Sequence, residues 1–433
     1  MQTAFTPEQL ADPDYAASHA AIRKCVHCGF CTATCPTYVL LGDERDSPRG
    51  RIELIKSMLE ADGAPSKETV THIDRCLSCL ACVTTCPSGV DYAQLIDHGR
   101  THIETHYRRP WFERVLRWGI PQVLTRPRRL RAALWLGRLT RPLEPLLEAL
   151  RLGPLAALLR LVPEHRSRDE FERSYPARGE TRGRVALLQG CVEPAMAPSI
   201  RAAAIRLITR AGFEVALVEG EVCCGALSEH LGRAEEARGF AAANLAAWSR
   251  AGPFAAIVTT AAGCGTTLKG YDRRVAGEAA STHAAAITRD VLEFIEEVGL
   301  PPVTRPGRIS VAYHAPCSLQ HGQQLKAGPA RLLAEAGFEV RQVAEGHLCC
   351  GSAGVYNILQ PALAGRLRDR KAANIARTGA AVVSAGNIGC IAQLAPALDA
   401  PVIHPVELLD WATGGPAPAG LEQLAVDAPG AAS

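Results

Sequence analysis

Two cysteine runs near the start of the chain constrain its fold more than any other feature. The runs are Cys25, Cys28, Cys31 and Cys35, followed by Cys76, Cys79, Cys82 and Cys86. In each run the cysteines are three, three and four residues apart, and a proline follows directly. Three thiolates at this spacing can surround one corner of an inorganic cluster, while the fourth side chain points away toward a second one. The fold therefore has to bring the two runs together.

This spacing is typical of bacterial two-cluster ferredoxins, in which the fourth cysteine of each run binds the cluster of the other run. It predicts two [4Fe–4S] clusters, one held by Cys25, Cys28, Cys31 and Cys86 and the other by Cys76, Cys79, Cys82 and Cys35. The alternative is a pair of zinc knuckles, because Cys-x-x-Cys also suits tetrahedral zinc. Zinc sites usually take two cysteines from each run, so four per run favours clusters and a protein that transfers electrons.

Composition limits the remaining classes. A chain of 433 residues suggests two or three domains. A net charge of +3 gives no reason to expect a nucleic-acid partner. The first twenty residues contain Glu8, Asp12 and Asp14 and no apolar segment, so we expect no secretion and no disulfide scaffold from the sixteen cysteines. No apolar run is long enough to span a bilayer, so we expect a soluble chain or one that lies on a membrane surface.

The residues around the two runs predict helices. Apolar side chains recur with helical period over residues 51–60, which favours an α-helical ferredoxin domain over one built from strands and turns. Pro48 lies near the start of this helix. Arg49 and Arg51 could donate hydrogen bonds to a cluster or contact a partner, although a solvated turn is an equal alternative. A single short helix is expected over Pro7–His19.

Residues 108–168 have a different composition. They contain fourteen arginines, four glutamates and neither lysine nor aspartate, which gives a net charge of +10. Seven prolines divide the segment into short helices, of which Trp111–Trp118 and Leu146–Leu161 are predicted to be amphipathic. Such basic helices can lie on an anionic membrane or contact a partner subunit. A connector between domains of the same chain is the simplest interpretation.

The remaining eight cysteines form an internal repeat. They are Cys191, Cys223, Cys224 and Cys264, which recur as Cys317, Cys349, Cys350 and Cys390, each 126 residues later. Each half alternates predicted strands and helices. The strands are Val185–Gln189, Glu214–Val218 and Ala256–Thr260 in the first half, and Ile309–Tyr313, Glu339–Val343 and Ala381–Ala385 in the second. This alternation predicts a parallel sheet whose carboxyl edge carries the cysteines.

The adjacent Cys-Cys-Gly residues of each half leave four interpretations open. They are a vicinal disulfide, ordinary core cysteines, a four-cysteine zinc site, and an iron–sulfur cluster in at least one half. We favour a cluster, because the chain already contains cluster-binding runs. The glycine, Gly225 or Gly351, would then let the backbone approach a bulky inorganic core.

These Cys-Cys-Gly repeats resemble the cysteine-rich domain of heterodisulfide reductase subunits, the anaerobic glycerol-3-phosphate dehydrogenase anchor subunit, lactate-utilisation proteins and glycolate oxidase iron–sulfur subunits. Two ferredoxin runs followed by two such domains narrow the resemblance to the glycolate oxidase iron–sulfur subunits. The motifs that carry it are Cys25–Tyr38, Gly42–Glu44, Pro48–Ile52, His347–Gly354 and Asn387–Cys390.

The resemblance implies an oxidoreductase complex of glycolate catabolism. FAD-binding partner subunits would oxidise glycolate to glyoxylate, and this chain would pass their electrons to a quinone or another acceptor. The implied location is the cytoplasm, with peripheral contact at the cytoplasmic face of the inner membrane as a further option. Alternatives are the iron–sulfur subunit of a lactate or glycerol-3-phosphate dehydrogenase, or a heterodisulfide-reductase-like enzyme.

One departure from the heterodisulfide reductase pattern bears on this choice. That pattern ends each repeat with Cys-x-x-Cys, which supplies a fifth cysteine for a non-cubane cluster. Here Cys264 is followed by Gly-Thr-Thr and Cys390 by Ile-Ala-Gln, so the fifth thiolate is missing in both halves. The absence argues against disulfide-reducing chemistry and leaves the metal or cluster of the repeats open.

The chain itself shows no means of oxidising an organic substrate. We find no Gly-x-Gly-x-x-Gly that follows a strand and no Gly-rich phosphate loop, so we expect neither a flavin nor a catalytic residue on this chain. His314, His321 and His347 lie near the repeat cysteines and could move protons or tune a cluster potential, although structural roles are favoured. The predicted domains are 1–105, 106–180, 181–304 and 305–415, with a flexible tail at 416–433.

Overall fold

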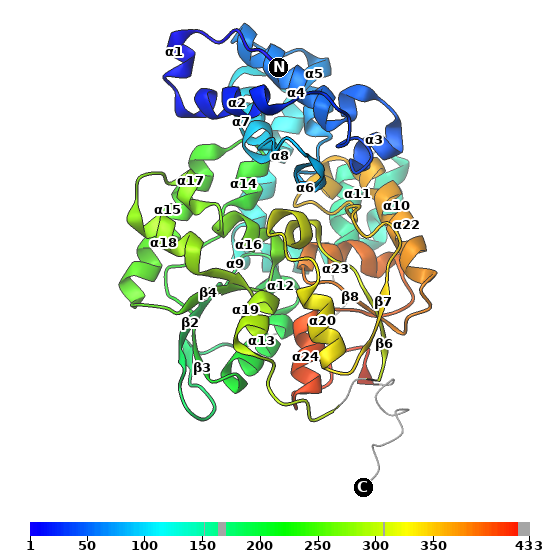
Figure 1. The fold of residues 1–433 in the computed structure, drawn as a ribbon. Helices are drawn as coiled ribbons and strands as arrows, with labels where there is room; N and C mark the ends of the chain where they lie inside the picture. Colours follow the sequence, from blue (N-terminus) through cyan, green and yellow to red (C-terminus); the bar gives the residue numbers. More distant parts are fainter. Residues whose placement is uncertain (151, 163–169, 306–307, 423–433) are drawn as a thin grey trace.

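The N-terminal part of the chain is helical, as its sequence predicts. The computed structural model describes residues 1–150, 152–162, 170–305 and 308–422 (Figure 1). The first domain contains α1 Pro7–Leu10, α2 Pro13–Lys24, α3 Pro36–Leu41, the 3₁₀ turn Glu44–Asp46, α4 Pro48–Ala61, α5 Lys67–Asp74, α6 Ala81–Thr85 and α7 Tyr92–His106. Its core of fully buried aliphatic side chains lies between α2, α4, α5 and α7.

Capping residues explain where these helices begin. The predicted helix over residues 51–60 lies within α4, which starts at Pro48 after Ser47 accepts a hydrogen bond from the Gly50 N–H. The single helix expected over Pro7–His19 is wrong, because the chain forms two. The Asp12 carboxylate accepts from the backbone N–H groups of Asp14 and Tyr15 and so starts α2 as a separate helix.

Four helices form the connector between the first domain and the repeats. They are α8 Trp111–Leu124, α9 Pro127–Thr140, α10 Glu144–Ala149 and α11 Gly153–Arg160. Pro121 lies inside α8 instead of ending it. The helix expected over Leu146–Leu161 is interrupted, because α11 begins only at Gly153 with Pro154 in its first turn. The end of the basic segment, 163–168, lies outside the described residues.

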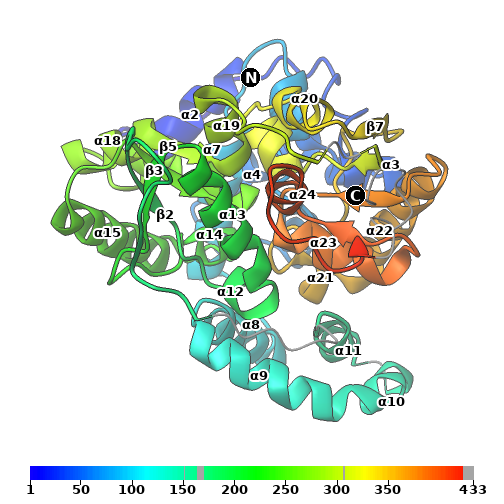
Figure 2. The same ribbon diagram turned by 90° about the horizontal axis from the view of Figure 1, so that it is seen from below.

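The connector packs against every other part of the chain. The Asp74 carboxylate on α5 lies 2.6 Å from the Arg109 guanidinium and 3.0 Å from that of Arg117. Ile120 on α8 is buried beside Leu231 of the first repeat and Ile358 of the second. These contacts fix the four helices as one layer along a single side of the molecule (Figure 2).

The first repeat contains a five-stranded sheet. Its strands are β1 Ser174–Tyr175, β2 Gly183–Leu187, β3 Phe213–Ala216, β4 Ala256–Thr259 and β5 Thr288–Asp290, in the order β1-β3-β2-β4-β5. All neighbours are parallel except β1, which pairs antiparallel to β3, so the sheet is mixed. Its helices are α12 Glu193–Met196, α13 Pro198–Arg210, α14 Ala226–His230, α15 Ala234–Ala251, α16 Ala262–Leu268, α17 Tyr271–Arg274, α18 Ala279–Ile287 and α19 Val291–Val298.

The second repeat has the same strand order without the antiparallel edge. Its strands β6 Ser310–Tyr313, β7 Glu339–Gln342, β8 Val382–Ser384 and β9 Val402–Ile403 form the parallel sheet β7-β6-β8-β9. Its helical elements are the π-helical turn Ser318–Gly322, α20 Gly328–Glu335, α21 Tyr356–Leu359, α22 Pro361–Ala376, α23 Ile388–Leu394, the 3₁₀ turn Ala395–Ala397 and α24 Pro405–Ala412. The predicted fold class, a helical ferredoxin domain followed by a duplicated α/β domain, is confirmed.

The two repeats share one core. The α13 helix packs on α24, and aliphatic side chains from both sheets form a continuous buried cluster between them. At its edge, the buried Asp410 carboxylate accepts hydrogen bonds from Arg206 and Arg210 of the other repeat. The first domain lies across the carboxyl edges of both sheets, at the top of Figure 1. Among the residues described, no helix is both long and apolar enough to cross a membrane.

Candidate functional site

The two cysteine runs interleave around two small neighbouring cavities. Cys25, Cys28, Cys31 and Cys86 line the first, together with Arg49 and Tyr92. Cys35, Cys76, Cys79 and Cys82 line the second, together with Arg51 and Tyr92. Each cavity thus receives three cysteines from one run and the last cysteine of the other, and Cys82 lines both cavities. These are the two sets that the sequence predicts as cluster ligands.

The backbone of each run is shaped to hold an anionic group. His27 and Gly29 in the first run, and Ser78 and Leu80 in the second, all have positive φ, between 51° and 85°. These residues stand two and four positions after the first cysteine of their runs. Alternating right- and left-handed conformations direct successive N–H groups into a concavity, a geometry found at many iron–sulfur sites. A positive φ is unfavourable for leucine, so Leu80 is strained in this loop. A leucine without a functional constraint rarely adopts this conformation.

The spacing of the sulfur atoms does not suit single zinc ions in these cavities. A tetrahedral zinc with Zn–S bonds of about 2.3 Å holds its four sulfur atoms roughly 3.8 Å apart. In the described part of the chain, no three cysteines of the two runs bring their sulfur atoms within 4.8 Å of one another. Four ligands spread more widely fit a larger inorganic core.

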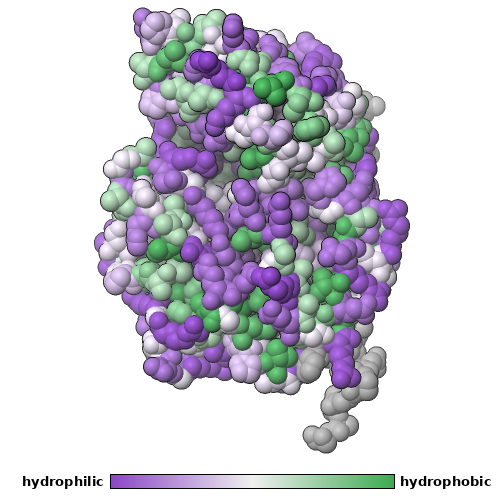
Figure 3. Space-filling view, in the orientation of Figure 1, coloured by the Kyte–Doolittle hydropathy of each residue, from purple (hydrophilic) through white to green (hydrophobic). Residues whose placement is uncertain are grey.

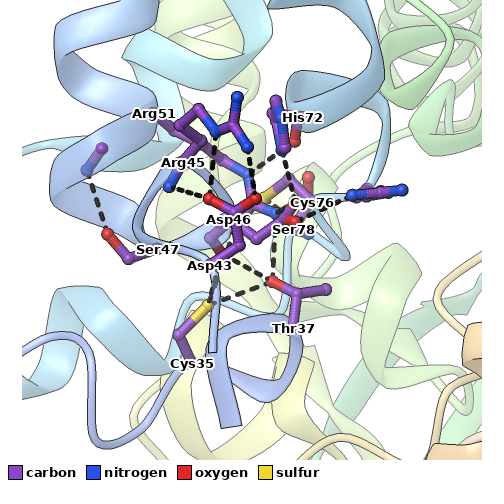
Figure 4. Close-up of polar contacts among 12 residues, drawn as sticks. Cys35, Thr37, Asp43, Arg45, Asp46, Ser47, Arg51, His72, Cys76 and Ser78 are labelled. Atoms are coloured by element: carbon purple, nitrogen blue, oxygen red, sulfur yellow. Dashed lines mark hydrogen bonds and ion pairs between the residues drawn. The ribbon is translucent and has the colours of Figure 1, made fainter. Parts of the chain in front are cut away.

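Arg51 is the polar centre of the second cavity (Figure 4). Its side chain is only 1% exposed, and its Nη1 lies 3.7 Å from the Cys35 Sγ. Its Nε donates to the His72 carbonyl at 2.7 Å, and its Nη2 donates to the Thr37 hydroxyl at 3.0 Å and to the Asp46 carboxylate at 3.2 Å. The possibility that Arg51 belongs to a solvated turn is wrong. Arg49, by contrast, is partly exposed and pairs with Glu44.

A second donor reaches the same cavity from α7. The hydroxyl of the buried Tyr92 donates to the Cys76 Sγ at 3.7 Å. Burial raises the pKa of Tyr92, so its hydroxyl keeps its proton. Burial likewise raises the pKa of the Cys79 and Cys82 thiols well above the usual range. Thiolates at these positions therefore need a strong positive partner such as iron.

The first cavity lies close to the molecular surface. Cys28 is exposed, whereas all four cysteines of the second cavity are buried. Two apolar neighbours in the same loop are also exposed, Val26 by 68% and Phe30 by 62%. The chain therefore offers solvent or a partner one accessible end of its paired cavities.

The eight repeat cysteines line a third cavity of about 650 Å³ between the two sheets and the connector. The Sγ atoms of Cys191 and Cys223 are 3.6 Å apart, and those of Cys224 and Cys264 are 3.2 Å apart. In the second repeat, the equivalent Cys317–Cys349 distance is 3.7 Å. The predicted convergence of these cysteines at the carboxyl ends of the strands is therefore seen. All sixteen cysteines lie in the described part of the chain and are free thiols, so the vicinal disulfide is not formed.

The glycine of each Cys-Cys-Gly motif has a role in the fold of its repeat. Gly225 and Gly351 have φ values of 94° and 90°. A Cβ at Gly351 would lie 2.6 Å from the Ala364 carbonyl oxygen on α22, and one at Gly225 would lie 3.1 Å from that of Ala237 on α15. Glycine is thus required for the turn and for the close approach of a helix.

The second cavity and the second repeat are in direct contact. Cys79 belongs to the same apolar cluster as Cys349 and Tyr356, with Cys317 at its edge. Across this boundary the Thr84 hydroxyl lies 2.7 Å from the His321 Nδ1, whose Nε2 is 3.2 Å from the His347 carbonyl. The structural role favoured for His321 agrees with these bonds. The candidate sites therefore form a row from the exposed Cys28 to the large cavity.

The positions of the missing fifth cysteines serve the fold. The Thr267 hydroxyl donates to the Gly263 carbonyl at 3.1 Å, and the Gln393 side chain accepts from Asn357 at 3.1 Å. Neither residue lines the large cavity. The geometry thus gives each repeat four cysteines at its site.

Two family models match most of these features. Residues 24–90 match the 4Fe-4S dicluster domain, and residues 185–269 and 311–395 each match the Cysteine-rich domain. The chain therefore holds two [4Fe–4S] clusters in its N-terminal domain. Together, the fold and the cavities define an iron–sulfur protein of the two-cluster, two-repeat type.

Relatives of known name narrow this class. The chain is 38% identical to the glycolate oxidase iron–sulfur subunit of Escherichia coli (strain K12), over 95% of this chain and 99% of the relative. It is 30% identical to a probable glycolate oxidase iron–sulfur subunit of Bacillus subtilis (strain 168), over 86% and 88%. Lactate utilization protein A of an Exiguobacterium strain is 26% identical over 52% of this chain. The chain belongs to the family of glycolate oxidase iron–sulfur subunits.

A tyrosine substitution tests the polar surroundings of the second cavity. We expect Tyr92→Phe to lower the reduction potential of one cluster by about 40 mV, since one hydrogen bond to sulfur is worth about 1 kcal/mol and favours the more negative, reduced state. Tyr356→Phe is the matched control, because this nearby buried hydroxyl has no hydrogen-bond partner among the described residues. Potentiometric titration followed by EPR measures both. Equal potentials in the wild type and Tyr92→Phe would contradict the assigned role of this hydroxyl.

Proposed function

We propose that this chain is the electron-transferring subunit of a glycolate oxidase complex. The observation that carries the proposal is the row of cysteine sites that leads without interruption from the exposed Cys28 to the cavity between the repeats. Partner flavin subunits would oxidise glycolate to glyoxylate, which releases two electrons and two protons. Similarity to the named relatives supports this substrate over lactate or glycerol 3-phosphate.

The ligand sets follow from the cavities. We assign Cys25, Cys28, Cys31 and Cys86 to one cluster, Cys35, Cys76, Cys79 and Cys82 to the other, and the eight repeat cysteines to further metal binding. A bound [4Fe–4S] cluster accepts and releases one electron at a time, which suits a chain placed between a two-electron flavin and a distant acceptor. The contribution of Arg51 and Tyr92 is to supply donors that favour the reduced state in the second cavity.

The exposed loop of the first run is the proposed docking site of the flavin subunits. Val26 and Phe30 are large apolar side chains that project beside the exposed Cys28. A partner that covers them would bring its flavin near the first cavity and would exclude water from it. The partly exposed Arg49, at the edge of the same cavity, can orient such a partner.

Glycolate-driven reduction tests the proposed function. When this chain is mixed anaerobically with the flavin subunits and glycolate, we expect its iron–sulfur absorbance to bleach, and we expect no bleaching without those subunits. Phe30→Glu should slow the bleaching at least about tenfold, since it places a charge in the proposed interface. Leu10→Glu, a similar change at an exposed position on α1, should not.

Two results of this experiment would contradict the proposal, one for the substrate and one for the docking site. Clusters that stay oxidised with glycolate but bleach with lactate or glycerol 3-phosphate and the matching flavin protein would overturn the substrate. Bleaching at the wild-type rate in Phe30→Glu would overturn the docking site and leave the substrate unaffected.

We further propose that the connector rests on the cytoplasmic face of an anionic membrane and that the acceptor is a quinone. The outer face of α8 exposes Trp111, Phe112, Val115 and Trp118, and the segment from α9 to α10 exposes Trp135, Leu136, Leu139, Leu143 and Leu146. Arg128, Arg129 and Arg131 are exposed at the start of α9. Aromatic and aliphatic side chains beside arginines are typical of helices that lie in the membrane interface.

The position of this surface favours a membrane over the bulk solvent. The connector helices lie on the opposite side of the molecule from the face in Figure 3, where hydrophobic residues are scattered among hydrophilic ones. Leu116, Leu134 and Leu159 of the same helices also line the cavity that holds the repeat cysteines. An apolar quinone in the bilayer would thus approach the chain from the side on which this cavity lies.

Vesicle binding tests the membrane contact. We expect the complex to sediment with vesicles that contain anionic lipid, and the triple change of Arg128, Arg129 and Arg131 to Glu to weaken this binding about a hundredfold, since each basic residue near the surface is worth about 1 kcal/mol. The same triple change at the exposed Arg23, Lys67 and Arg238 should have little effect. An equal loss of vesicle binding in both variants, or no vesicle binding by the wild type, would contradict the proposal. If only the connector variant loses the flavin subunits, the connector contacts a protein partner instead.

A further inference from the structure

His314 is a buried histidine whose side chain the fold leaves without a hydrogen-bond partner. It follows β6 directly, and its backbone N–H donates to the Ser384 carbonyl at 2.8 Å. The residue is only 2% exposed, and neither Nδ1 nor Nε2 has a hydrogen-bond partner among the described residues. Burying an unsatisfied polar group is costly, so such groups usually have a role that the protein atoms alone do not show.

Two buried cysteines lie close to this imidazole. A ring nitrogen of His314 and the Sγ atoms of Cys350 and Cys390 all lie within 4.8 Å of one another. A metal ion bonded at about 2.0 Å to nitrogen and 2.3 Å to sulfur would bring these atoms slightly closer together. The three residues come from the ends of β6, the Cys-Cys-Gly turn and α23, so the parallel sheet itself places them together.

Few other groups in the structure offer this geometry. Among the residues described, the other set of three close donors is Asp43, Asp46 and His72. That set is already neutralised, because the Asp46 carboxylate is paired with Arg51 and Arg75. The His314 set has no such cation within it. Lys371, a cation whose charge acts on His314, donates to the Glu345 carbonyl at 2.6 Å.

The first repeat lacks this histidine. The residue 126 positions before His314 is Leu188, a buried aliphatic side chain. In that repeat no three donors lie within 4.8 Å of one another, although its four cysteines are all described. The duplicated domain therefore keeps its cysteines in both copies and adds an imidazole to only one of them.

We propose that His314 is a metal ligand, and that the second repeat holds a mixed histidine–cysteine centre with Cys350 and Cys390. Its occupant is a first-row transition metal that accepts imidazole and thiolate together, either an iron of an iron–sulfur centre or a zinc ion. Ligation satisfies one of the two ring nitrogens. The inference rests on the proposed function to the extent that it requires the repeat cysteines to bind metal.

The chemistry of an added imidazole gives the two repeats different roles. Replacing anionic thiolate by neutral imidazole makes an iron site easier to reduce, as it does in Rieske centres. With iron bound, the second repeat would then be the more oxidising of the two, next to Cys79 of the second cavity. With zinc bound, the second repeat would instead hold its contact with the second cavity rigid and would carry no electrons.

Elemental analysis of anaerobically purified full-length protein tests two claims separately, namely that the repeat cysteines bind metal and that His314 is one of the ligands. We expect Cys350→Ser to lose metal, and His314→Ala to lose the same metal in the same amount. His321→Ala is the matched control, because that histidine is also buried and already has partners for both ring nitrogens. It should retain the wild-type metal content. His314→Cys, which restores a ligand, should regain the metal that His314→Ala loses.

Isotope labelling identifies the bond itself. With iron bound, pulsed EPR of wild-type protein that carries ¹⁵N-histidine should show a nitrogen coupling that is absent in His314→Cys. With zinc bound, X-ray absorption should show one nitrogen scatterer that His314→Cys replaces by sulfur. If Cys350→Ser loses metal but His314→Ala keeps it, the ligand role of His314 is wrong and the repeats remain metal sites. If neither Cys350→Ser nor Cys224→Ser loses any metal, metal binding by the repeats is wrong as well.

Discussion

The interleaving of two cysteine runs around two adjacent cavities is the constraint on which the rest of the structure depends. Neither cavity is complete without a residue from the other run, so residues 25–35 and 76–86 have to fold as one unit. Arg51 reinforces this unit, because its guanidinium joins Cys35 of the first run and Thr37 just after it to the carbonyl of His72 just before the second run. A buried cation in contact with sulfur is costly by itself and becomes favourable beside a negatively charged cluster.

From this unit the fold extends the row of sites into the duplicated domain. The parallel sheets place the repeat cysteines at their carboxyl edges, and the N-terminal domain covers those same edges (Figure 1). Cys79 and Cys349 belong to one buried apolar cluster, which joins the two halves of the row and excludes water from their boundary. The connector then closes the large cavity from the side and leaves its own aromatic residues exposed. One chain thus offers a surface at each end of the row.

Much of this arrangement could be predicted from the sequence, because cysteine spacing and repeat offset are local patterns with few structural solutions. The sharing of Cys35 and Cys86 between runs, the helix over 51–60 and three strands per repeat all follow from such patterns. The short strands β5 and β9 were not predicted, since runs of two or three residues carry no periodic signal. The helix expected over residues 146–161 is broken before Gly153, because Gly153-Pro154 starts a new helix. The continuous apolar pattern across these residues obscures that signal.

The parts of the site that escaped prediction depend on tertiary contacts. Tyr92 lies six residues after the second run, and nothing in its sequence context indicates that its hydroxyl reaches Cys76. The convergence of His314 with Cys350 and Cys390 joins residues up to 76 positions apart, and only the parallel pairing of β6 with β8 brings them together. The 126-residue offset did contain one signal, namely that His314 replaces a leucine of the first repeat.

The count of iron and acid-labile sulfide in anaerobically purified protein tests the central claim most directly. Two [4Fe–4S] clusters require about eight irons and eight sulfides per chain, and the account predicts this number with further metal from the repeats. Cys31→Ser and Cys82→Ser should each remove roughly half of those eight irons, because the proposed ligand sets assign these two cysteines to different clusters. Fewer than about four irons per chain after careful reconstitution, or stoichiometric zinc in the two runs, would contradict the account.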